Sequence, residues 1–119
     1  MDITIYHNPA CSKSRETLKL MLNAGIEPTV IDYMKNPPDE ATLASLVEQM
    51  GISVKDLMRQ NEELFKTLGL GSDATSDEDR LTAMAEHPKL INRPVVVALA
   101  GAKICRPPEL VLELIEASR

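Results

Sequence analysis

The first third of the chain places one helical run between two strand-like runs, and this order restricts the fold more than any other feature. Residues 3–6 (Ile-Thr-Ile-Tyr) are typical of a strand, and residues 29–31 (Thr-Val-Ile) predict a second one. Between them, apolar residues take helical spacing from Ser12 to Gly25, a residue that commonly ends helices. A strand–helix–strand unit of this kind joins parallel strands through a right-handed crossover. We therefore expect a βαβ unit at the start of the chain.

The middle of the chain, about residues 39–87, is predicted to be helical. The residues 36–39 (Asn-Pro-Pro-Asp) indicate a turn and a helix start, and apolar residues then recur at i, i+3, i+4 and i+7 until Gly51. Two shorter helical pieces and a loop rich in Gly, Ser and Asp follow. Ser76 with Asp79 resembles a capping box, which predicts the start of one more helix.

The last third of the chain predicts a hairpin and a helix. Residues 94–99 form the strongest strand pattern, Gly101 indicates a turn, and residues 102–105 are the expected hairpin partner. Pro107 and Pro108 would begin a final amphipathic helix. A βαβ unit and a ββα unit together make an α/β fold with a mixed four-stranded sheet, separated by a helical insertion. This layout is similar to the thioredoxin and glutaredoxin fold.

The size and charge of the chain exclude several classes of function. At 119 residues and 44% hydrophobic composition, we expect one domain over residues 1–119. The net charge is −5, and the sequence has no run of basic residues that could follow a phosphate backbone. Both features argue against nucleic acid as a partner. No stretch approaches the roughly 20 apolar residues that span a bilayer. We expect a cytoplasmic protein without membrane contact.

The chain has only two cysteines, Cys11 and Cys105. Two are too few for a secreted disulfide framework, and they lack the paired spacing of a zinc site. We therefore predict free thiols and no metal site.

Cys11 lies at the junction between the first strand and the first helix. Unpaired backbone N–H groups at a helix start favour an anion, so this thiol should become a thiolate easily, and the same groups would accept an oxyanion. His7 could add positive charge if it is protonated, or it could simply bond to backbone. Ser14 offers a hydroxyl donor, and Arg15 follows about one turn along the helix. The alternative, a buried structural cysteine, is disfavoured by polar neighbours on both sides.

The residues after Cys11 limit its chemistry. Cys11-Ser12-Lys13-Ser14 has the form Cys-x-x-Ser, which lacks the second thiol of a Cys-x-x-Cys oxidoreductase. An external thiol would have to complete a redox cycle. In the sequence, Arg15 also follows the cysteine at a shorter spacing, Cys-x3-Arg, than the Cys-x5-Arg of a phosphatase loop. This spacing argues against phosphatase chemistry of the usual kind.

Four blocks of the sequence carry a family resemblance. "HNPACSKSR", "LMRQNEELFKTLGL", "LINRPVVV" and "GAKICRPPEL" resemble, in order, the blocks of the arsenate reductases that depend on glutathione and glutaredoxin. The similarity covers nearly the whole chain. It implies that Cys11 is the nucleophile and that three arginines surround the oxyanion: Arg59, Arg93 and Arg106.

The resemblance also implies roles for the neighbours of these residues. His7 matches a histidine associated with lowering the thiol pKa, and Ser14 matches a serine that hydrogen-bonds the sulfur. The peptide bond before Pro94 would be cis and face the cysteine. Cys105 matches a position beside the last arginine where it is not needed as a resolving thiol, so we interpret it as a core residue or a neighbour of the site.

The implied activity is the reduction of arsenate to arsenite, with a role in arsenical resistance. Cys11 would attack arsenic, glutathione would act as co-substrate, and glutaredoxin would regenerate the enzyme; no bound cofactor is implied. Two alternatives share the fold. One is a regulator similar to the Spx-type proteins that bind RNA polymerase, and the other is a monothiol glutaredoxin-like thiol oxidoreductase.

Overall fold

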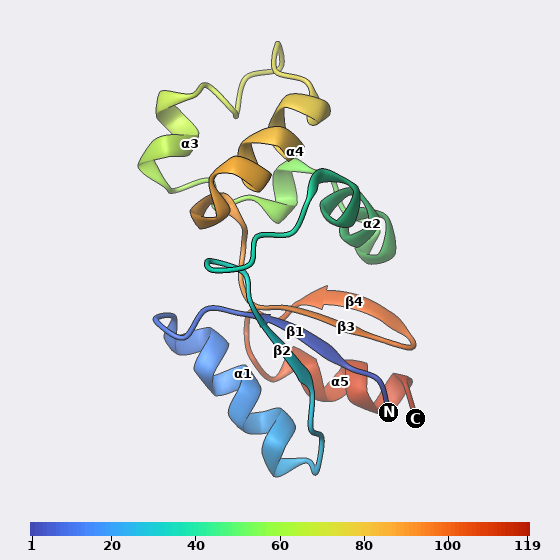
Figure 1. Cartoon of the computed structure of the whole chain (residues 1–119). Coiled ribbons are helices and arrows are strands. Elements are labelled where there is room, and N and C mark those ends of the chain that lie inside the picture. Colours follow the sequence, from blue (N-terminus) through green and yellow to red (C-terminus); the bar gives the residue numbers. More distant parts are fainter. The chain divides into compact units, whose positions relative to one another are not determined.

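A four-stranded mixed sheet is built from the two ends of the chain. This computed structural model describes residues 1–119, and its strands are β1 (Thr4–His7), β2 (Thr29–Asp32), β3 (Val95–Ala98) and β4 (Gly101–Ile104). They lie in the order β2-β1-β3-β4 (Figure 1). β1 pairs parallel with β2 and antiparallel with β3, and β3 pairs antiparallel with β4. The predicted mixed sheet with a βαβ half and a ββα half is confirmed.

Two helices, α1 (Ser12–Asn23) and α5 (Leu110–Ala117), lie on the same side of this sheet and contact each other (Figure 1). α1 ends where predicted, because Gly25 takes a positive φ of 79° that other residues rarely adopt. α5 begins later than predicted. Pro107 and Pro108 lie in the preceding turn, where their carbonyls accept bonds from the N–H groups three residues on, at Leu110 and Val111.

The apolar core of this part of the chain fills the space between the sheet and the two helices. Strands and helices contribute to one buried cluster: Ile3, Ile5, Met21, Val96, Ala98, Cys105, Val111, Leu114 and Ile115. Burying a Leu, Ile or Val side chain contributes about 1.5–3 kcal/mol each. The core therefore fixes β1 against α1, and with them the short loop that joins the two.

The chain divides into two units. The first joins Met1–Asn36 to Arg93–Arg119 and contains the sheet, α1 and α5; the second is Pro37–Asn92. The segment predicted as a helical insertion, about residues 39–87, falls within the second unit. The prediction of a single domain stays a prediction.

The second unit contains three α-helices: α2 (Glu40–Met50), α3 (Glu63–Thr67) and α4 (Asp77–Glu86). Each long helix has a capping side chain at its start. Asp39 accepts a bond from Thr42 N at the start of α2, and Ser76 accepts one from Asp79 N at the start of α4, as the sequence predicts. α2 packs against α4, and two short 3-10 helices complete the unit, at Lys55–Leu57 and Pro88–Leu90.

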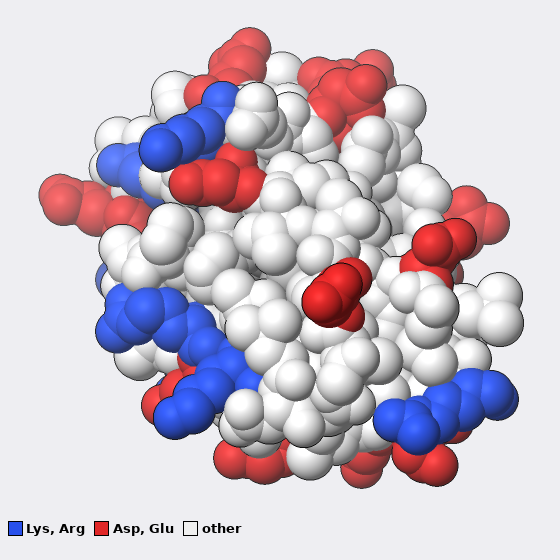
Figure 2. All heavy atoms as spheres, turned by 60° about the horizontal axis from the view of Figure 1, so that its bottom comes forward, with Lys and Arg blue, Asp and Glu red and all other residues white.

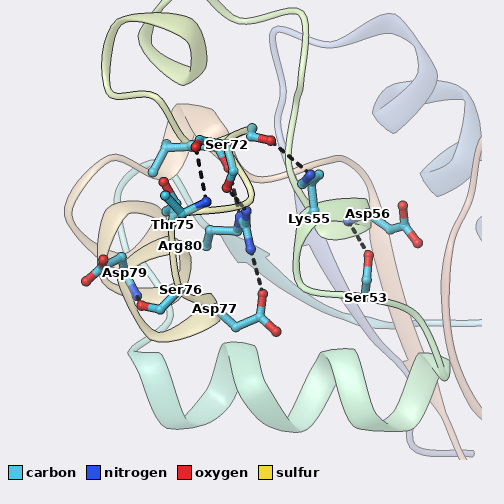
Figure 3. Close-up of polar contacts among 12 residues, drawn as sticks. Ser53, Lys55, Asp56, Ser72, Thr75, Ser76, Asp77, Asp79 and Arg80 are labelled. Carbon is cyan, nitrogen blue, oxygen red and sulfur yellow. Dashed lines mark hydrogen bonds and ion pairs between the residues drawn. The ribbon is translucent and has the colours of Figure 1, made fainter.

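A buried arginine holds the loop between α3 and α4. Arg80 is 7% exposed, and its Nε donates to the carbonyl of Leu70 at 2.8 Å, while one terminal nitrogen donates to the carbonyl of Ser72 at 2.9 Å. The other terminal nitrogen bonds to Asp77 Oδ1 at 2.9 Å (Figure 3). Asp77 thus balances the charge of Arg80, while two of its hydrogen bonds hold main-chain carbonyls of this loop, which the sequence alone predicts as irregular.

Charged side chains are interspersed on the face drawn in Figure 2. Acidic and basic groups alternate there with uncharged atoms, and they form no continuous basic band on that face. None of the helices combines the length and the apolar character needed to cross a membrane.

Replacing Arg80 should destabilise the second unit. In Arg80→Leu, two carbonyls lose their donors, so we expect the free energy of unfolding to fall by about 2–3 kcal/mol in urea titrations. Asp77→Asn is the matched control, because it removes only a partly exposed ion pair and should cost less than about 1 kcal/mol. Equal losses in the two variants would mean that the carbonyl bonds do not dominate.

Candidate active site

The loop between β1 and α1 is held in one conformation by Asn8. The carbonyl of Asn8 accepts a bond from Cys11 N at 3.0 Å, and its side-chain Oδ1 accepts one from Ala10 N at 3.0 Å. Its Nδ2 donates to the buried Tyr33 hydroxyl at 3.4 Å. These bonds leave Cys11 with an extended backbone at the N-cap of α1, where φ is −97° and ψ is 123°. The predicted position of the thiol at the helix start is therefore confirmed.

Arg15 ties the first turn of α1 back to the same loop. Its terminal nitrogen donates to the carbonyl of Pro9 at 2.9 Å, and its backbone N–H donates to the carbonyl of Cys11 at 3.0 Å. This side chain therefore supports the loop main chain that leads into the cysteine.

The thiol of Cys11 is shifted toward its ionised form. Burial by itself would raise its pKa, but the backbone N–H groups of Ser14 and Lys13 and the Arg93 guanidinium outweigh that effect and lower the pKa. The sulfur makes no side-chain capping hydrogen bond at the helix start, so the influence of these N–H groups on the pKa is mainly electrostatic. A partly exposed thiol with a lowered pKa is the usual form of a reactive cysteine.

The sheet explains why two distant arginines lie at this sulfur. Val95 pairs with Tyr6 near the end of β1 and with Ile104 at the end of β4, so these three residues form one row across the sheet. Arg93 precedes that row and Arg106 follows it. Both arginines therefore lie at the end of the sheet where β1 leads into the cysteine loop.

Both guanidiniums interact with the sulfur. A terminal nitrogen of Arg106 lies 4.0 Å from Cys11 Sγ and also donates to the carbonyl of Arg93 at 3.3 Å. Arg93 contributes its charge and a side-chain hydrogen bond to the thiolate. The peptide bonds Arg93–Pro94 and Arg106–Pro107 are both cis, and the first agrees with the resemblance. Two planar cations at one thiolate form a setting suited to a tetrahedral oxyanion.

His7 and Ser14 form a buried pair beside the loop. His7 Nδ1 lies 2.6 Å from Ser14 Oγ, and Asn8 N donates to the same oxygen at 3.0 Å. Burial lowers the pKa of His7, as the charge of Arg15 also does, while Asp32 opposes the shift. Since the ordinary pKa lies near 6.5 and burial lowers it, the neutral form of His7 is favoured at neutral pH.

The hydroxyl of Ser14 and its N–H group therefore have separate partners. The hydroxyl bonds to His7 and Asn8, whereas the backbone N–H lowers the Cys11 pKa. The sulfur bond that the resemblance assigns to this hydroxyl stays a prediction.

Two further residues that the sequence analysis singles out, Cys105 and Arg59, have contacts of their own. Cys105 is buried in the core, where desolvation raises its pKa to about 12, and its sulfur lies 3.8 Å from the carbonyl of Lys103. It is therefore a core thiol. Arg59 belongs to the second unit, where its N–H donates to the carbonyl of Leu90 and its guanidinium pairs with Glu62.

Sequence reasoning missed Asn8 and Tyr33. The Asn-Pro dipeptide before Cys11 is a turn signal and could have indicated the role of Asn8. Nothing in the sequence brings Tyr33 to it, because that contact depends on the pairing of β1 with β2. No group of three or more His, Cys, Asp or Glu residues is arranged to hold a metal ion.

These features define a class of protein: a thioredoxin-like fold with a cysteine of lowered pKa at the start of its first helix and guanidiniums at the sulfur. The profile of the ArsC family matches residues 6–114. The chain therefore belongs to the ArsC family.

Individual relatives are similar over nearly the whole chain. An arsenate reductase of Rhizobium meliloti (strain 1021) is 52% identical, over 97% of this chain and 82% of that protein. The uncharacterized protein YfgD of Escherichia coli (strain K12) is 50% identical, over 95% of this chain and 96% of that protein. The solved structure of an arsenate reductase from Vibrio cholerae is 53% identical with a TM-score of 0.93, covering 95% of this chain and 97% of that one.

Removing the Arg93 charge should raise the pKa of the Cys11 thiol. Arg93 favours the thiolate, so in Arg93→Ala the pH at which alkylation reaches half its maximal rate should move upward. Lys13→Ala is the matched control, because it removes one positive charge from an exposed side chain that pairs with Glu16. Mass spectrometry should find Cys105 unmodified in every variant. An unchanged pH profile in Arg93→Ala would exclude the guanidinium as a cause of the lowered pKa.

Proposed function

We propose that this protein reduces arsenate to arsenite with Cys11 as the nucleophile. The observation that carries the proposal is the thiol of lowered pKa at the start of α1, with Arg93 and Arg106 at its sulfur. Relatives named arsenate reductase that are half identical to this chain support arsenate as the substrate.

The arginines address the main electrostatic obstacle of the reaction. Arsenate is a tetrahedral oxyanion that is negatively charged near neutral pH, and a thiolate that attacks it meets like-charge repulsion. Guanidinium groups are always charged, and their planar donors match pairs of oxygens. Preorganised charge of this kind stabilises the transition state, by several kcal/mol where the bound substrate excludes water.

Two thiols supply the electrons for the reduction. The Cys11 thiolate attacks arsenic and forms an S–As bond as one oxygen leaves as water. A second thiol then forms a bond to the Cys11 sulfur, and the electron pair of the S–As bond remains on arsenic, which passes from As(V) to As(III). Arsenite leaves, and the two sulfurs remain joined as a disulfide. The reduction of that disulfide by a further thiol completes the cycle.

We propose glutathione as the second thiol and glutaredoxin as the protein that reduces the mixed disulfide, on the family resemblance. The same resemblance supports Arg59 as a further oxyanion ligand. We also propose a cytoplasmic location. His7 and Ser14 act as positioning residues here. Their hydrogen bond fixes the first turn of α1, whose Ser14 N–H favours the thiolate.

Loss of the Cys11 thiol should abolish arsenate reduction. We expect Cys11→Ser to fold normally and to release no arsenite above background in an assay with glutathione and glutaredoxin at neutral pH. A serine hydroxyl is not ionised at that pH. Cys105→Ala is the control. It removes the other thiol and should keep most of the activity. Full activity in Cys11→Ser would remove this residue from the chemistry.

Loss of the Arg106 side chain should weaken substrate capture. A hydrogen bond to a charged group contributes about 1.5–3 kcal/mol, so kcat/KM for arsenate in Arg106→Ala should fall about 10-fold to 100-fold. The rate of thiol alkylation at a pH above the thiol pKa should change little, which separates anion capture from thiol reactivity. Equal falls in both rates would contradict a specific anion-binding role.

The two alternative functions predict other outcomes. A monothiol glutaredoxin-like enzyme would turn over a glutathionylated protein without inhibition by sulfate or phosphate, because it needs no oxyanion site. A polymerase-binding regulator would co-purify with RNA polymerase and would show no arsenate turnover.

A further inference from the structure

The second unit contains an arginine–carboxylate pair that the main chain itself assembles. Arg59 N donates to the carbonyl of Leu90 at 2.8 Å, which anchors this residue beside the bridge between Met58 and Ile91. Glu62 N then donates to the carbonyl of Arg59 at 3.1 Å and closes a turn. The two side chains therefore leave the same turn at an i,i+3 spacing and meet.

The pair neutralises the guanidinium without satisfying its donors. The nearest atoms, Arg59 NH1 and Glu62 Oε2, are 3.6 Å apart, which is longer than a hydrogen bond between these groups. The two side chains are only 22% and 24% exposed. Arg59 Nε is buried and has no hydrogen-bond partner. The hydrogen-bonding capacity of this guanidinium is thus incompletely used, and it lies beside a carboxylate that would repel an oxyanion.

We propose that Glu62 is a specificity-determining residue that discriminates among oxyanions by their charge. This inference rests on the proposed function in so far as Arg59 binds the substrate oxyanion. Glu62 is the resident counter-ion of Arg59, and an entering anion must displace its carboxylate or bind beside it. The repulsion grows with the charge of the anion, so Glu62 disfavours a doubly charged tetrahedral anion more than a singly charged one.

The rival explanation is purely structural. An i,i+3 ion pair could simply stabilise the turn, and it would then contribute to the free energy of unfolding without affecting anions. The adjacent Glu63 provides a control for a general charge effect, because it is exposed and has the same charge at the neighbouring position.

The test measures binding of two tetrahedral anions, sulfate as a dianion and perchlorate as a monoanion, by calorimetry at constant ionic strength. In Glu62→Gln we expect sulfate to bind about fivefold more tightly, the factor that a partly exposed ion pair supports, and perchlorate affinity to rise less. Glu63→Gln should leave both affinities nearly unchanged. In the double variant Arg59→Ala/Glu62→Gln, the gain relative to Arg59→Ala should disappear.

Three results would overturn the proposal: equal gains for both anions, an equal gain in Glu63→Gln, or no gain in Glu62→Gln, including undetectable sulfate binding. A changed urea midpoint with unchanged anion affinity would assign the pair to the turn alone. An arsenate reduction assay on the wild-type protein tests the proposed function separately. Discrimination between the two anions without arsenate reduction would contradict only the proposed function. Arsenate reduction without discrimination between the anions would contradict only the role of Glu62.

Discussion

The candidate active site depends on the interaction between one sulfur atom, that of Cys11, and the start of α1. The N–H groups of Lys13 and Ser14, together with Arg93, must stay directed toward the sulfur to keep its pKa low, because partial burial alone would raise that pKa. The loop must therefore be rigid. Asn8 fixes it from the strand side and Arg15 from the helix side, while the apolar core holds β1 against α1 behind them.

The same requirement explains the use of the sheet. A chain of this size has few ways to bring cations from distant positions to one atom at fixed geometry. The pairing of β3 with β1 and β4 achieves this. The residue before the first strand of an antiparallel hairpin and the residue after its second strand lie at the same end of the sheet. Arg93 and Arg106 occupy those flanking positions. Strand register brings both residues to the same end of the sheet, so their approach to Cys11 follows from the pairing of Val95 with Tyr6 and Ile104.

Much of this could be predicted from the sequence because it is local. Strand patterns, Gly25, Gly51 and the Ser76 cap mark most element boundaries, and the strand-to-helix junction places Cys11. The remaining features depend on tertiary contacts. The lowered pKa of His7 follows from its burial, and the partners of the Ser14 hydroxyl follow from the approach of β1 to α1. The pairing of Arg59 with Glu62 depends on the Leu90 contact, which helical periodicity does not indicate.

The two cysteines show how environment assigns different roles to one side chain. Cys11, at a helix start beside cations, has a lowered pKa, whereas the pKa of Cys105, in the apolar core, is raised to about 12. A buried neutral thiol is a poor nucleophile toward a disulfide or an adduct. Ser14 occupies the position at which a Cys-x-x-Cys protein has its second thiol. Any two-electron reduction at Cys11 must therefore draw its second thiol from another molecule, so the surface around the sulfur has to admit a thiol donor as well as an oxyanion.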